Sequence, residues 1–565
     1  MTESIRGRAA WVAAILPAAV LAIGAWCHRW VCEDAFICFR VADQILAGNG
    51  PVFNAGERVE AYTSPAWMAL LTLWQALGGR IEEGSLVLGI LAAGVGVVTA
   101  VLAAARRHAP RAVVPFGALV LVVTTAVWDF AASGLEMGLV LAWLGTSYAL
   151  LSRAASDRRA SGAGAFAWFG IGILIRPDLG LFAIGFLLIA LFLRRGMTNT
   201  QAGSIASSLV AFGAVPLLYL LFRMGYFAAW MSNSSIAKEP GLAHGTAGAY
   251  YLLDFVHVYR LWIVAPLVLL LAWLARSSRR IPLVGVEATF FALGVLHAVY
   301  VARVGGDFMH GRFVLPAYMA MLIPFFVLPV APLRRPAAAV GALALYGWCA
   351  ASAFVFGPHY RYNRRGVANE RLLYIELAGR PHPVRLEDYD DTIFGREGRA
   401  LRKEAELGGR RLLVALTDDP AGGYLPADAR RVAPLSASLH PRITVAAPAW
   451  NIGIIGRHAG TRAFVADRLG LADPIGSRLR LKTPGRPGHE KLLPLAVVEA
   501  RLTDPQPGER AEVTGARAML AGPEARELIE ATSAPMSVPR FFSNVLSAVR
   551  LTSLRFDFER LVPPR

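Results

Sequence analysis

The stretch WVAAILPAAVLAIGAWCHRWVCEDAFICFR, residues 11–40, decides the class of fold. Its first part belongs to an apolar run near residues 9–28, and a membrane-spanning helix needs about 20 such residues. The run lacks a convincing small-residue cleavage site and further apolar runs follow, so we expect an uncleaved first transmembrane helix. The acids Glu33 and Asp34 follow this run closely. Because a carboxylate is costly near the bilayer core, acids at this border usually mark a site.

Composition indicates an integral membrane protein. The chain has 565 residues, of which 55% are hydrophobic and 17% charged, and its mean hydropathy is +0.47. A soluble protein of this size does not need so much apolar surface. The net charge is +17, but the basic residues lie in short loops between apolar runs. This pattern is typical of the positive-inside rule and of contact with membrane lipid, so we expect no nucleic-acid partner.

The apolar runs predict a polytopic helical protein with about eleven spans. They lie near residues 9–28, 84–105, 112–128, 133–152, 163–175, 178–194, 204–222, 258–275, 283–302, 312–331 and 336–356. A further run at 64–79 begins with Ser64, which suits an N-cap, and Pro65, which suits the first helical turn. It is short for a span, so we expect a re-entrant or interfacial helix there.

Basic clusters predict the orientation. If residues 64–79 do not cross and the N-terminus is cytoplasmic, every cluster faces the cytoplasm. The clusters are Arg106/Arg107/Arg111, Arg153/Arg158/Arg159, Arg194/Arg195, Arg276/Arg279/Arg280 and Arg334/Arg335. The candidate polar residues of many loops then all fall on the outer side. This topology predicts a multi-pass protein of the plasma membrane with its C-terminal part outside.

The sequence changes in character near residue 358. Residues 1–357 form the predicted transmembrane catalytic domain, and residues 358–565 are rich in charged residues, Pro and Gly. Short apolar runs at 412–416, 443–446 and 462–467 are typical of strands. We therefore expect a mixed α/β extracytoplasmic domain over 358–565.

Two outer loops carry candidate catalytic and sugar-binding residues. Glu33 and Asp34 suit a cation site or a base with an orienting partner, and the alternative is a solvated turn without a role. The following loop supplies planar hydrogen-bonding groups and stacking faces of the kind that sugars need, in Glu57, Arg58, Glu60, Tyr62 and Trp67. The alternative for this loop is an amphipathic segment lying among lipid headgroups.

A third group of residues suits the binding of a phosphorylated ligand. Arginine grips phosphate with a planar fork. The candidate phosphate-binding residues are Arg40, Arg176, Lys238, Arg312 and His310, with Glu136 and Asp307 as further substrate-binding candidates. Salt bridges at helix borders and snorkelling side chains are the alternatives. The sequence contains no recognised metal-ligand set and no nucleotide-binding glycine loop, so no cofactor is predicted with certainty, although a divalent cation at the acids is compatible with the sequence.

Several stretches resemble the GT-C class of polyprenyl-phosphate-dependent glycosyltransferases, and within it the mycobacterial terminal β-(1→2)-arabinofuranosyltransferases. They are Leu46-Ala-Gly-Asn-Gly-Pro-Val-Phe-Asn54, Gly56-Glu-Arg-Val-Glu-Ala61, Ser133-Gly-Leu-Glu136, Arg223-Met-Gly-Tyr226, Ala237-Lys238, Gly305-Gly-Asp-Phe-Met-His310 and Arg540-Phe-Phe-Ser-Asn-Val-Leu546. The resemblance implies a GT-C-like fold. It also implies decaprenylphosphoryl-arabinofuranose as donor and the arabinan termini of arabinogalactan or lipoarabinomannan as acceptor.

The resemblance also narrows the choice of catalytic acid. The family has Asp-Asp where this chain has Glu33-Asp34, so we expect Asp34 to be the catalytic acid and Glu33 to support it. In that family the donor and product are both β anomers, which leaves Asp34 three roles: nucleophile, stabiliser of an oxocarbenium ion, or base for the acceptor hydroxyl. The alternatives to this function are a GT-C transferase with another sugar, a transporter and a non-catalytic envelope or flagellar membrane protein.

Overall fold

A computed structural model describes most of the chain. The described residues are 2–108, 113–157, 161–194, 205–239, 244–276, 285–329, 336–407, 411–415, 430–481 and 488–558. They form two compact units, each built from segments distant in sequence. Unit 1 comprises Met1–Trp30, Ser85–Leu217 and Ala243–Leu373, and unit 2 comprises Val31–Gly84, Leu218–Leu242 and Tyr374–Arg565. The segment 31–84 thus folds with the C-terminal part, and the domain boundary at residue 357 stays a prediction.

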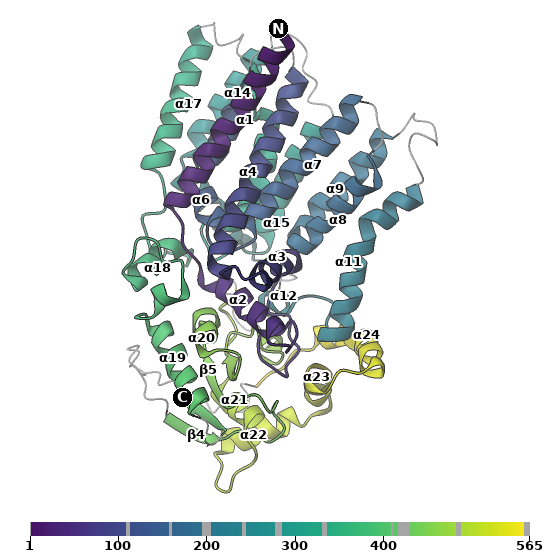
Figure 1. The fold of residues 1–565 in the computed structure, drawn as a ribbon, viewed down its shortest axis with the longest axis vertical. Helices are drawn as coiled ribbons and strands as arrows, with labels where there is room; N and C mark the ends of the chain where they lie inside the picture. Colours follow the sequence, from purple (N-terminus) through teal and green to yellow (C-terminus); the bar gives the residue numbers. More distant parts are fainter. Residues whose placement is uncertain are drawn as a thin grey trace. The chain divides into compact units, whose positions relative to one another are not determined.

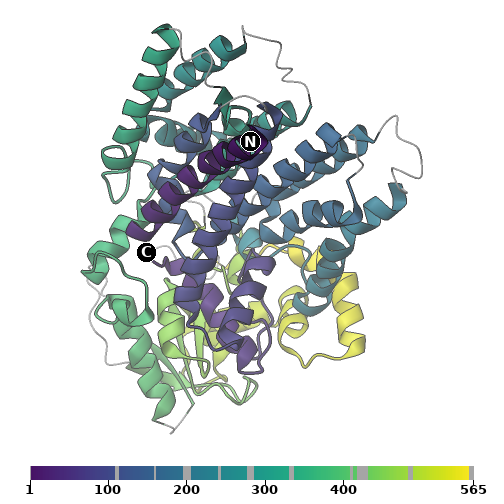
Figure 2. The ribbon, with the colours of Figure 1, turned by 45° about the horizontal axis from the view of Figure 1, so that its top comes forward.

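Unit 1 is a bundle of apolar helices (Figures 1 and 2). Its longer helices are α1 (Thr2–Cys27), α4 (Ile81–His108), α7 (Met137–Asp157), α8 (Ala163–Ile175), α9 (Gly180–Leu193), α11 (Ile205–Phe227), α13 (Gly245–Val258), α14 (Leu261–Arg276), α15 (Val286–Arg303) and α17 (Pro336–Phe354). The last turns of α11, from Leu218, belong to unit 2, as does the start of α4 up to Gly84.

Several of these helices are suited to cross a membrane. Among the described residues, five are long and apolar enough: Ala9–Cys27, Ile81–Arg107, Ile205–Phe227, Val286–Arg303 and Pro336–Phe354. The pair α13 and α14, bent by 72°, makes a sixth if it is one span. Shorter apolar helices cover Ala163–Ile175, Pro177–Leu193 and Arg312–Phe325. These helices fit a polytopic membrane protein, whereas the number eleven stays a prediction.

One predicted apolar run has a break in the structure, and a second break separates the predicted runs 163–175 and 178–194. The run 112–128 divides into α5 (Phe116–Val122) and α6 (Thr125–Ala131). Between α8 and α9, Arg176 is extended (φ −156°, ψ 138°) and Pro177 begins a short 3-10 turn. Proline disfavours helical backbone in the residue before it, so α8 ends here and α9 packs back against it. Arg111, Arg158, Arg159, Arg195, Arg279, Arg280, Arg334 and Arg335, which the orientation argument used, lie outside the described residues.

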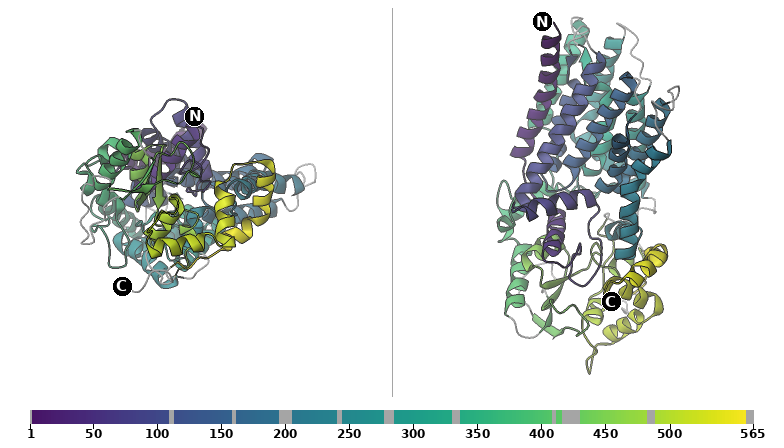
Figure 3. Two further views of the ribbon diagram at one scale, coloured as in Figure 1. Left: turned by 90° about the horizontal axis from the view of Figure 1, so that it is seen from below. Right: turned by 45° about the vertical axis from the view of Figure 1, so that its right-hand side comes forward.

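Unit 2 combines a small sheet with short helices. The strands β3 (Leu412–Ala415), β4 (Arg430–Pro434), β5 (Val445–Ala449) and β6 (Ala463–Asp467) are ordered β4-β3-β5-β6, with β4 antiparallel to β3 and the others parallel. The helices include α2 (Glu33–Leu46), α3 (Pro65–Ala76), α12 (Asn233–Lys238), α19 (Ile393–Glu406), α20 (Ile452–Ala459), α21 (Leu495–Leu502), α22 (Ala511–Leu520), α23 (Pro523–Ser533) and α24 (Val538–Ser553). Figure 3 shows α23 and α24 in yellow.

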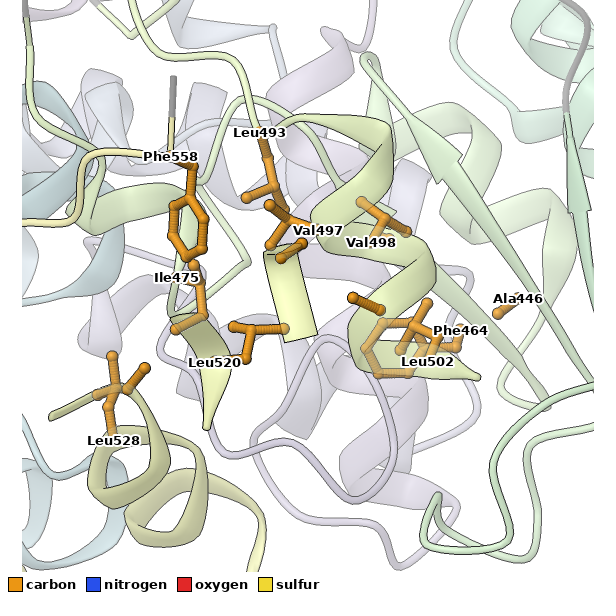
Figure 4. Packing of buried hydrophobic residues seen from close by; sticks show 14 of the residues in the cluster. Ala446, Phe464, Ile475, Leu493, Val497, Val498, Leu502, Leu520, Leu528 and Phe558 are labelled. Carbon is orange, nitrogen blue, oxygen red and sulfur yellow. The ribbon is translucent and has the colours of Figure 1, made fainter. Parts of the chain in front are cut away.

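One hydrophobic core joins the three segments of unit 2 (Figure 4). Ala446 and Phe464 of the sheet meet Val498 and Leu502 of α21 in this cluster. Full burial of a Leu or Phe side chain contributes roughly 1.5–3 kcal/mol. Ala55 and Ala228 belong to the same core, so the segments 31–84 and 218–242 are integral parts of unit 2.

Candidate active site

The acidic pair begins helix α2 of unit 2. Both acids lie in the first turn, where the partial positive charge of the helix N-terminus favours a carboxylate. Glu33 is buried and its Oε1 accepts a hydrogen bond from the Gly453 main-chain N–H of α20. A Cβ on Gly453 would lie 2.1 Å from the Glu33 carbonyl oxygen, so only glycine permits this approach. Asp34 is half-buried and is the more accessible acid.

Arg40 lies further along α2, and all the hydrogen-bond donors of its guanidinium group have acceptors within unit 2. It is 1% exposed. Its five N–H groups donate to four main-chain carbonyls and one side-chain amide, those of Phe53, Gly456, Gly460, Ala463 and Asn54. Burial lowers the pKa of Arg40 to about 10. The predicted phosphate-binding role is not supported by this geometry, because no donor is left for a ligand. Arg40 instead fastens α2 to the C-terminal part.

The predicted sugar-binding residues Glu57 and Arg58 are also buried, and they contact distant segments of unit 2. Glu57 Oε1 lies 3.1 Å from Arg501 Nη2, and Arg501 Nη1 lies 2.7 Å from Asp473 Oδ2. Burial raises the pKa of Glu57 to about 7, with Asp473 adding to the shift and Arg501 opposing it. Arg58 donates to main-chain carbonyls of Tyr226, Ala531 and Ala534 at 2.6–3.2 Å, and burial lowers the pKa of Arg58.

Glu60, Tyr62 and Trp67 complete this buried loop. Glu60 accepts hydrogen bonds from Arg223 Nε and Tyr219 Oη, each at 2.6 Å. Tyr62 Oη accepts from Tyr219 Oη at 3.3 Å, and burial raises the pKa of Tyr62. Trp67 is 1% exposed. The cavity beside Arg58 and Glu60 measures about 10 Å³, space for about one water and not for a sugar. Burial therefore does not support an open sugar-binding surface on this loop.

Lys238 lies elsewhere in unit 2, at the last residue of α12. Its side chain is half-buried and runs beside Gly488, whose ideal Cβ would lie 3.1 Å from Lys238 Cε. The next residue, Glu239, has a left-handed backbone (φ 42°) and ends the helix. Glu239 pairs with Lys491 at 2.6 Å and with Arg555 at 3.0 Å. A phosphate-binding role for Lys238 stays a prediction.

Unit 1 brings four predicted residues into one ion-pair cluster. Arg312 Nη2 lies 3.4 Å and Arg176 Nε 3.8 Å from the same Oε1 of Glu136. Arg312 Nη1 lies 3.8 Å from Asp307 Oδ2. These residues come from the α8 end, the start of α7 and the loop after α15, and all four are buried or nearly so. The two guanidinium groups share the Glu136 carboxylate, and guanidinium groups held in this way can grip a phosphate with donors that the carboxylates do not use.

Arg176 is held in place from its other side. Its Nε and Nη2 donate to Asp178 Oδ1 and Oδ2 at 3.0 and 3.2 Å, and His297 Nε2 contacts Asp178 Oδ2 at 2.8 Å. Its Nη1 is buried without a hydrogen-bond partner. An unsatisfied buried donor costs about 1–3 kcal/mol, so an anionic ligand oxygen at this atom would be stabilising. His297 was not among the predicted residues, although a histidine inside the apolar run 283–302 was a signal for it.

His310 of unit 1 forms a second polar network. Its Nδ1 lies 2.8 Å from Asp254 Oδ2, and Tyr360 Oη donates to the same oxygen at 2.5 Å. Asn363 Nδ2 donates to Asp254 Oδ1 at 3.1 Å. The Nε2 atom of His310 is buried without a hydrogen-bond partner. The sequence did not predict Asp254 as a partner, and its signal was an acid within the apolar helix α13.

The possible metal site has no support from geometry. Over the residues that the structure describes, no group of three or more His, Cys, Asp and Glu side chains could hold a metal ion.

Comparison with known proteins identifies the family. Residues 428–560 match the AftB family C-terminal domain, and residues 63–220 match a family described as dolichyl-phosphate-mannose-protein mannosyltransferase. A terminal β-(1→2)-arabinofuranosyltransferase of Mycobacterium tuberculosis is 31% identical over 97% of this chain and 95% of its own length. The chain belongs to the terminal β-(1→2)-arabinofuranosyltransferase family. The Corynebacterium glutamicum protein of the same name is 31% identical over 95% of this chain and 84% of its own.

Membership in the terminal arabinofuranosyltransferase family confirms the resemblance found in the sequence. It makes the chain a membrane glycosyltransferase that takes a sugar donor and an acceptor. No solved structure matches the chain.

Two stretches that carried the family resemblance meet in unit 2. Asn544 Nδ2 of α24 donates to the Gly225 carbonyl of α11 at 2.9 Å. An ideal Cβ on Gly225 would lie 2.2 Å from the Phe541 ring, so the ring packs directly on the glycine. Arg223 of the same stretch pairs with Glu60. The family stretches therefore hold unit 2 together, in addition to any role in binding.

Proposed function

We propose that the chain transfers an arabinofuranosyl residue from decaprenylphosphoryl-arabinofuranose to the arabinan termini of cell-wall arabinogalactan or lipoarabinomannan. The observation that carries this proposal is the match, over nearly the whole length of both chains, to a relative named for terminal β-(1→2)-arabinofuranosyl transfer. A transferase that uses a prenyl-linked donor needs a membrane domain, and the apolar helices supply one.

In this proposal Arg176 and Arg312 hold the donor phosphate. The reaction breaks the bond between the sugar and the phosphate, so negative charge grows on the leaving phosphate, and preorganised donors stabilise such charge. Support comes from the unpartnered Nη1 of Arg176 and from the shared carboxylate of Glu136, which holds the two guanidinium groups close together. His310, whose Nδ1–H faces Asp254, has an unpartnered Nε2 that in the neutral ring can accept a hydrogen bond from a sugar hydroxyl.

Asp34 is the proposed catalytic acid, and Glu33 supports it. Glu33 is buried and accepts a hydrogen bond from the Gly453 N–H, whereas Asp34 is half-buried and more accessible, and this difference in exposure supports the choice of Asp34 as the reactive carboxylate. A carboxylate beside the anomeric carbon has three roles open to it: attack on that carbon, stabilisation of an oxocarbenium ion, or removal of the acceptor hydroxyl proton. Each role requires an ionised aspartate, so the neutral isostere Asp34→Asn tests all three together.

The proposed setting is the plasma membrane, with about eleven spans, the N-terminus in the cytoplasm and a C-terminal α/β domain over residues 358–565 outside. Support comes from the basic clusters in the short loops. Residues 64–79, helix α3 in the structure, are proposed to lie in the membrane interface. Leu73 and Leu77 are exposed there, which supports an apolar environment for this helix.

The direct test is transfer by the purified full-length protein. We expect it to extend a short arabinan when given the prenyl-phosphate arabinose. Because general acid–base catalysis contributes about 10²–10⁴-fold, Asp34→Asn is expected to lower kcat by about 10²-fold or more. The matched control is Asp43→Asn, a half-buried acid on the same helix that pairs with Arg457 and accepts a hydrogen bond from Gln75; its substitution is expected to affect stability and to leave kcat unchanged. Full activity of Asp34→Asn, or no product from the wild type, would contradict the proposal.

The match of residues 63–220 to a mannosyltransferase family favours a second candidate function, transfer of mannose from a prenyl-phosphate donor. The two candidates differ in the donor alone. A parallel assay with prenyl-phosphate mannose and prenyl-phosphate arabinose distinguishes them, and we expect product only with arabinose. Addition of a chelator to the same assay tests whether the transfer reaction depends on a divalent cation.

A further inference from the structure

Helix α24 of unit 2 has an apolar side that no described part of the chain covers. It faces the rest of unit 2 with Asn544, Ala548, Leu551 and Thr552, which are buried. A different side of the helix carries a stripe of large apolar residues at helical spacing. Their exposed fractions are 72% for Val538, 59% for Phe542, 87% for Leu546 and 57% for Val549. Contiguous exposed apolar surface of this kind marks an interaction site.

The polar residues of α24 lie beside this stripe. Ser543 and Arg550 are exposed next to it, and Arg550 pairs with Glu527 of the neighbouring helix α23. The helix therefore has three sides: buried, polar and exposed apolar. A helix with a narrow apolar side, basic residues and a modest apolar content overall is typical of segments that lie in the plane of a membrane interface.

The contacts between α24 and α11 indicate which surroundings cover the exposed apolar stripe. The helix is attached to the last turn of α11 through Asn544 and Phe541, which meet Gly225. Helix α11 is one of the candidate spans, and only 6% of its most apolar 18-residue stretch is buried within the protein. Its last turns expose Leu218 and Leu221. The exposed apolar surface of a membrane span thus continues at the attachment point of α24.

An exposed tryptophan lies just after the end of α11, close to α24. Trp230 follows the end of α11, is 44% exposed, and its main-chain N–H donates to Thr552 Oγ1 of α24 at 3.2 Å. Tryptophan is enriched where membrane spans meet the headgroup region. The end of an apolar candidate span, an exposed tryptophan and an amphipathic helix therefore lie together within unit 2.

We infer that α24 is an interfacial helix that lies in the headgroup region of the bilayer, with Val538, Phe542, Leu546 and Val549 reaching toward the acyl chains. The partner is a lipid surface. This role anchors unit 2 to the membrane at the end of α11, and it does not depend on which sugar the enzyme transfers.

Depth-dependent fluorescence quenching tests this inference on the full-length protein. The protein, with its native cysteines replaced, is labelled with an environment-sensitive fluorophore at Leu546→Cys or Phe542→Cys and placed in nanodiscs of phosphatidylcholine and phosphatidylglycerol. The matched control is Ser543→Cys, an exposed position on the polar side of the same helix. These side chains are exposed, so labelling does not threaten folding.

We expect lipids that carry a nitroxide on the upper acyl chain to quench the label at 542 and 546 several-fold more strongly than the label at 543, whereas aqueous iodide shows the reverse order. Equal and weak nitroxide quenching at the three positions would overturn the inference. A disulfide between two copies of the unlabelled Leu546→Cys variant, without nitroxide quenching of the labelled one, would also overturn it, because the stripe would then face a second copy of the chain.

Discussion

Two buried arginines differ in how fully their donors are used. Every N–H group of Arg40 has a protein acceptor, whereas Nη1 of Arg176 has none. A guanidinium can bind a ligand only with donors that the fold leaves open. The same residue type therefore serves the fold of unit 2 in one case and is open to an anion of the reaction in the other.

Arg40→Lys is expected to destabilise unit 2 without weakening donor binding. Lysine has three donors in place of five and no planar fork, so several buried carbonyls lose their partner at a cost on the order of 3 kcal/mol. Thermal unfolding of the full-length protein in detergent measures the loss, and the KM for the donor is expected to stay unchanged.

The control for that measurement is Arg442→Lys. Arg442 is also in unit 2 and bonds to Ala47 O and Asn49 Oδ1, each at 2.8 Å, but it is exposed. We expect little change in its unfolding temperature. If Arg40→Lys kept full stability and raised the donor KM, Arg40 would bind the phosphate as first predicted from the sequence.

The sequence indicated the kind of chemistry at each residue but not its exposure. Glu136, Arg176 and Arg312 were predicted to lie on one outer face together with many other polar residues, and the structure places both arginines within 3.8 Å of the Glu136 carboxylate. Glu57 and Glu60 were assigned to a sugar because their loop offers planar hydrogen-bonding groups and stacking faces beside a tryptophan. Their partners Arg501 and Arg223 lie more than a hundred residues away, and nothing in the local sequence indicates that pairing.

At the scale of elements, the contact between α11 and α24 rests on a single glycine. Gly225→Ala is expected to destabilise the protein by about 1–3 kcal/mol, because overpacking forces neighbouring groups to move. The added Cβ would lie 2.2 Å from the Phe541 ring. Thermal unfolding measures the effect, and Phe541→Ala in the same chain is expected to remove most of it, as a double-mutant cycle would show.

Gly213→Ala on the same helix is the matched control. The new methyl group meets only the flexible end of Leu217, at 3.3 Å, and alanine is intrinsically the better helix former. We therefore expect a neutral or stabilising change at Gly213. Equal effects at the two glycines would show that helix propensity, and not the packing of Phe541, decides the result at Gly225.

Elements were predicted well where a long apolar run stood alone. Helices α1, α4 and α17 lie close to the runs near 9–28, 84–105 and 336–356. The strand β4 was not predicted, because a five-residue segment that begins with Arg430 and Arg431 lacks the apolar pattern of a strand. Helix α24 was not predicted as an element. The division of its surface into a buried, a polar and an exposed apolar side depends on how it packs within unit 2, which the local sequence does not indicate.

At the scale of the whole molecule, the discontinuity of unit 2 predicts the behaviour of fragments. A soluble fragment of residues 374–565 is expected not to fold alone, because α20 and β6 lose the contacts of Arg40 and Asn54, and the core loses Ala55 and Ala228. Circular dichroism and urea unfolding are expected to show no cooperative transition.

The matched fragment carries residues 31–84 and 218–242 joined to 374–565 by flexible linkers. It retains the three segments of unit 2 and is expected to unfold cooperatively. Cooperative unfolding of the shorter fragment would show instead that the C-terminal part folds by itself, in agreement with the domain division predicted at residue 357.

The hydrogen bond between Glu33 and Gly453 has a consequence for biogenesis. The two residues are 420 positions apart, and synthesis proceeds at about 5–20 residues per second, so roughly 20–80 seconds separate their appearance at the ribosome. During that interval α1 is already made, while the hydrogen bond from Gly453 to the acidic turn after α1 cannot yet form. The nascent chain therefore carries the proposed catalytic turn long before the segment that fixes Glu33 has been synthesised.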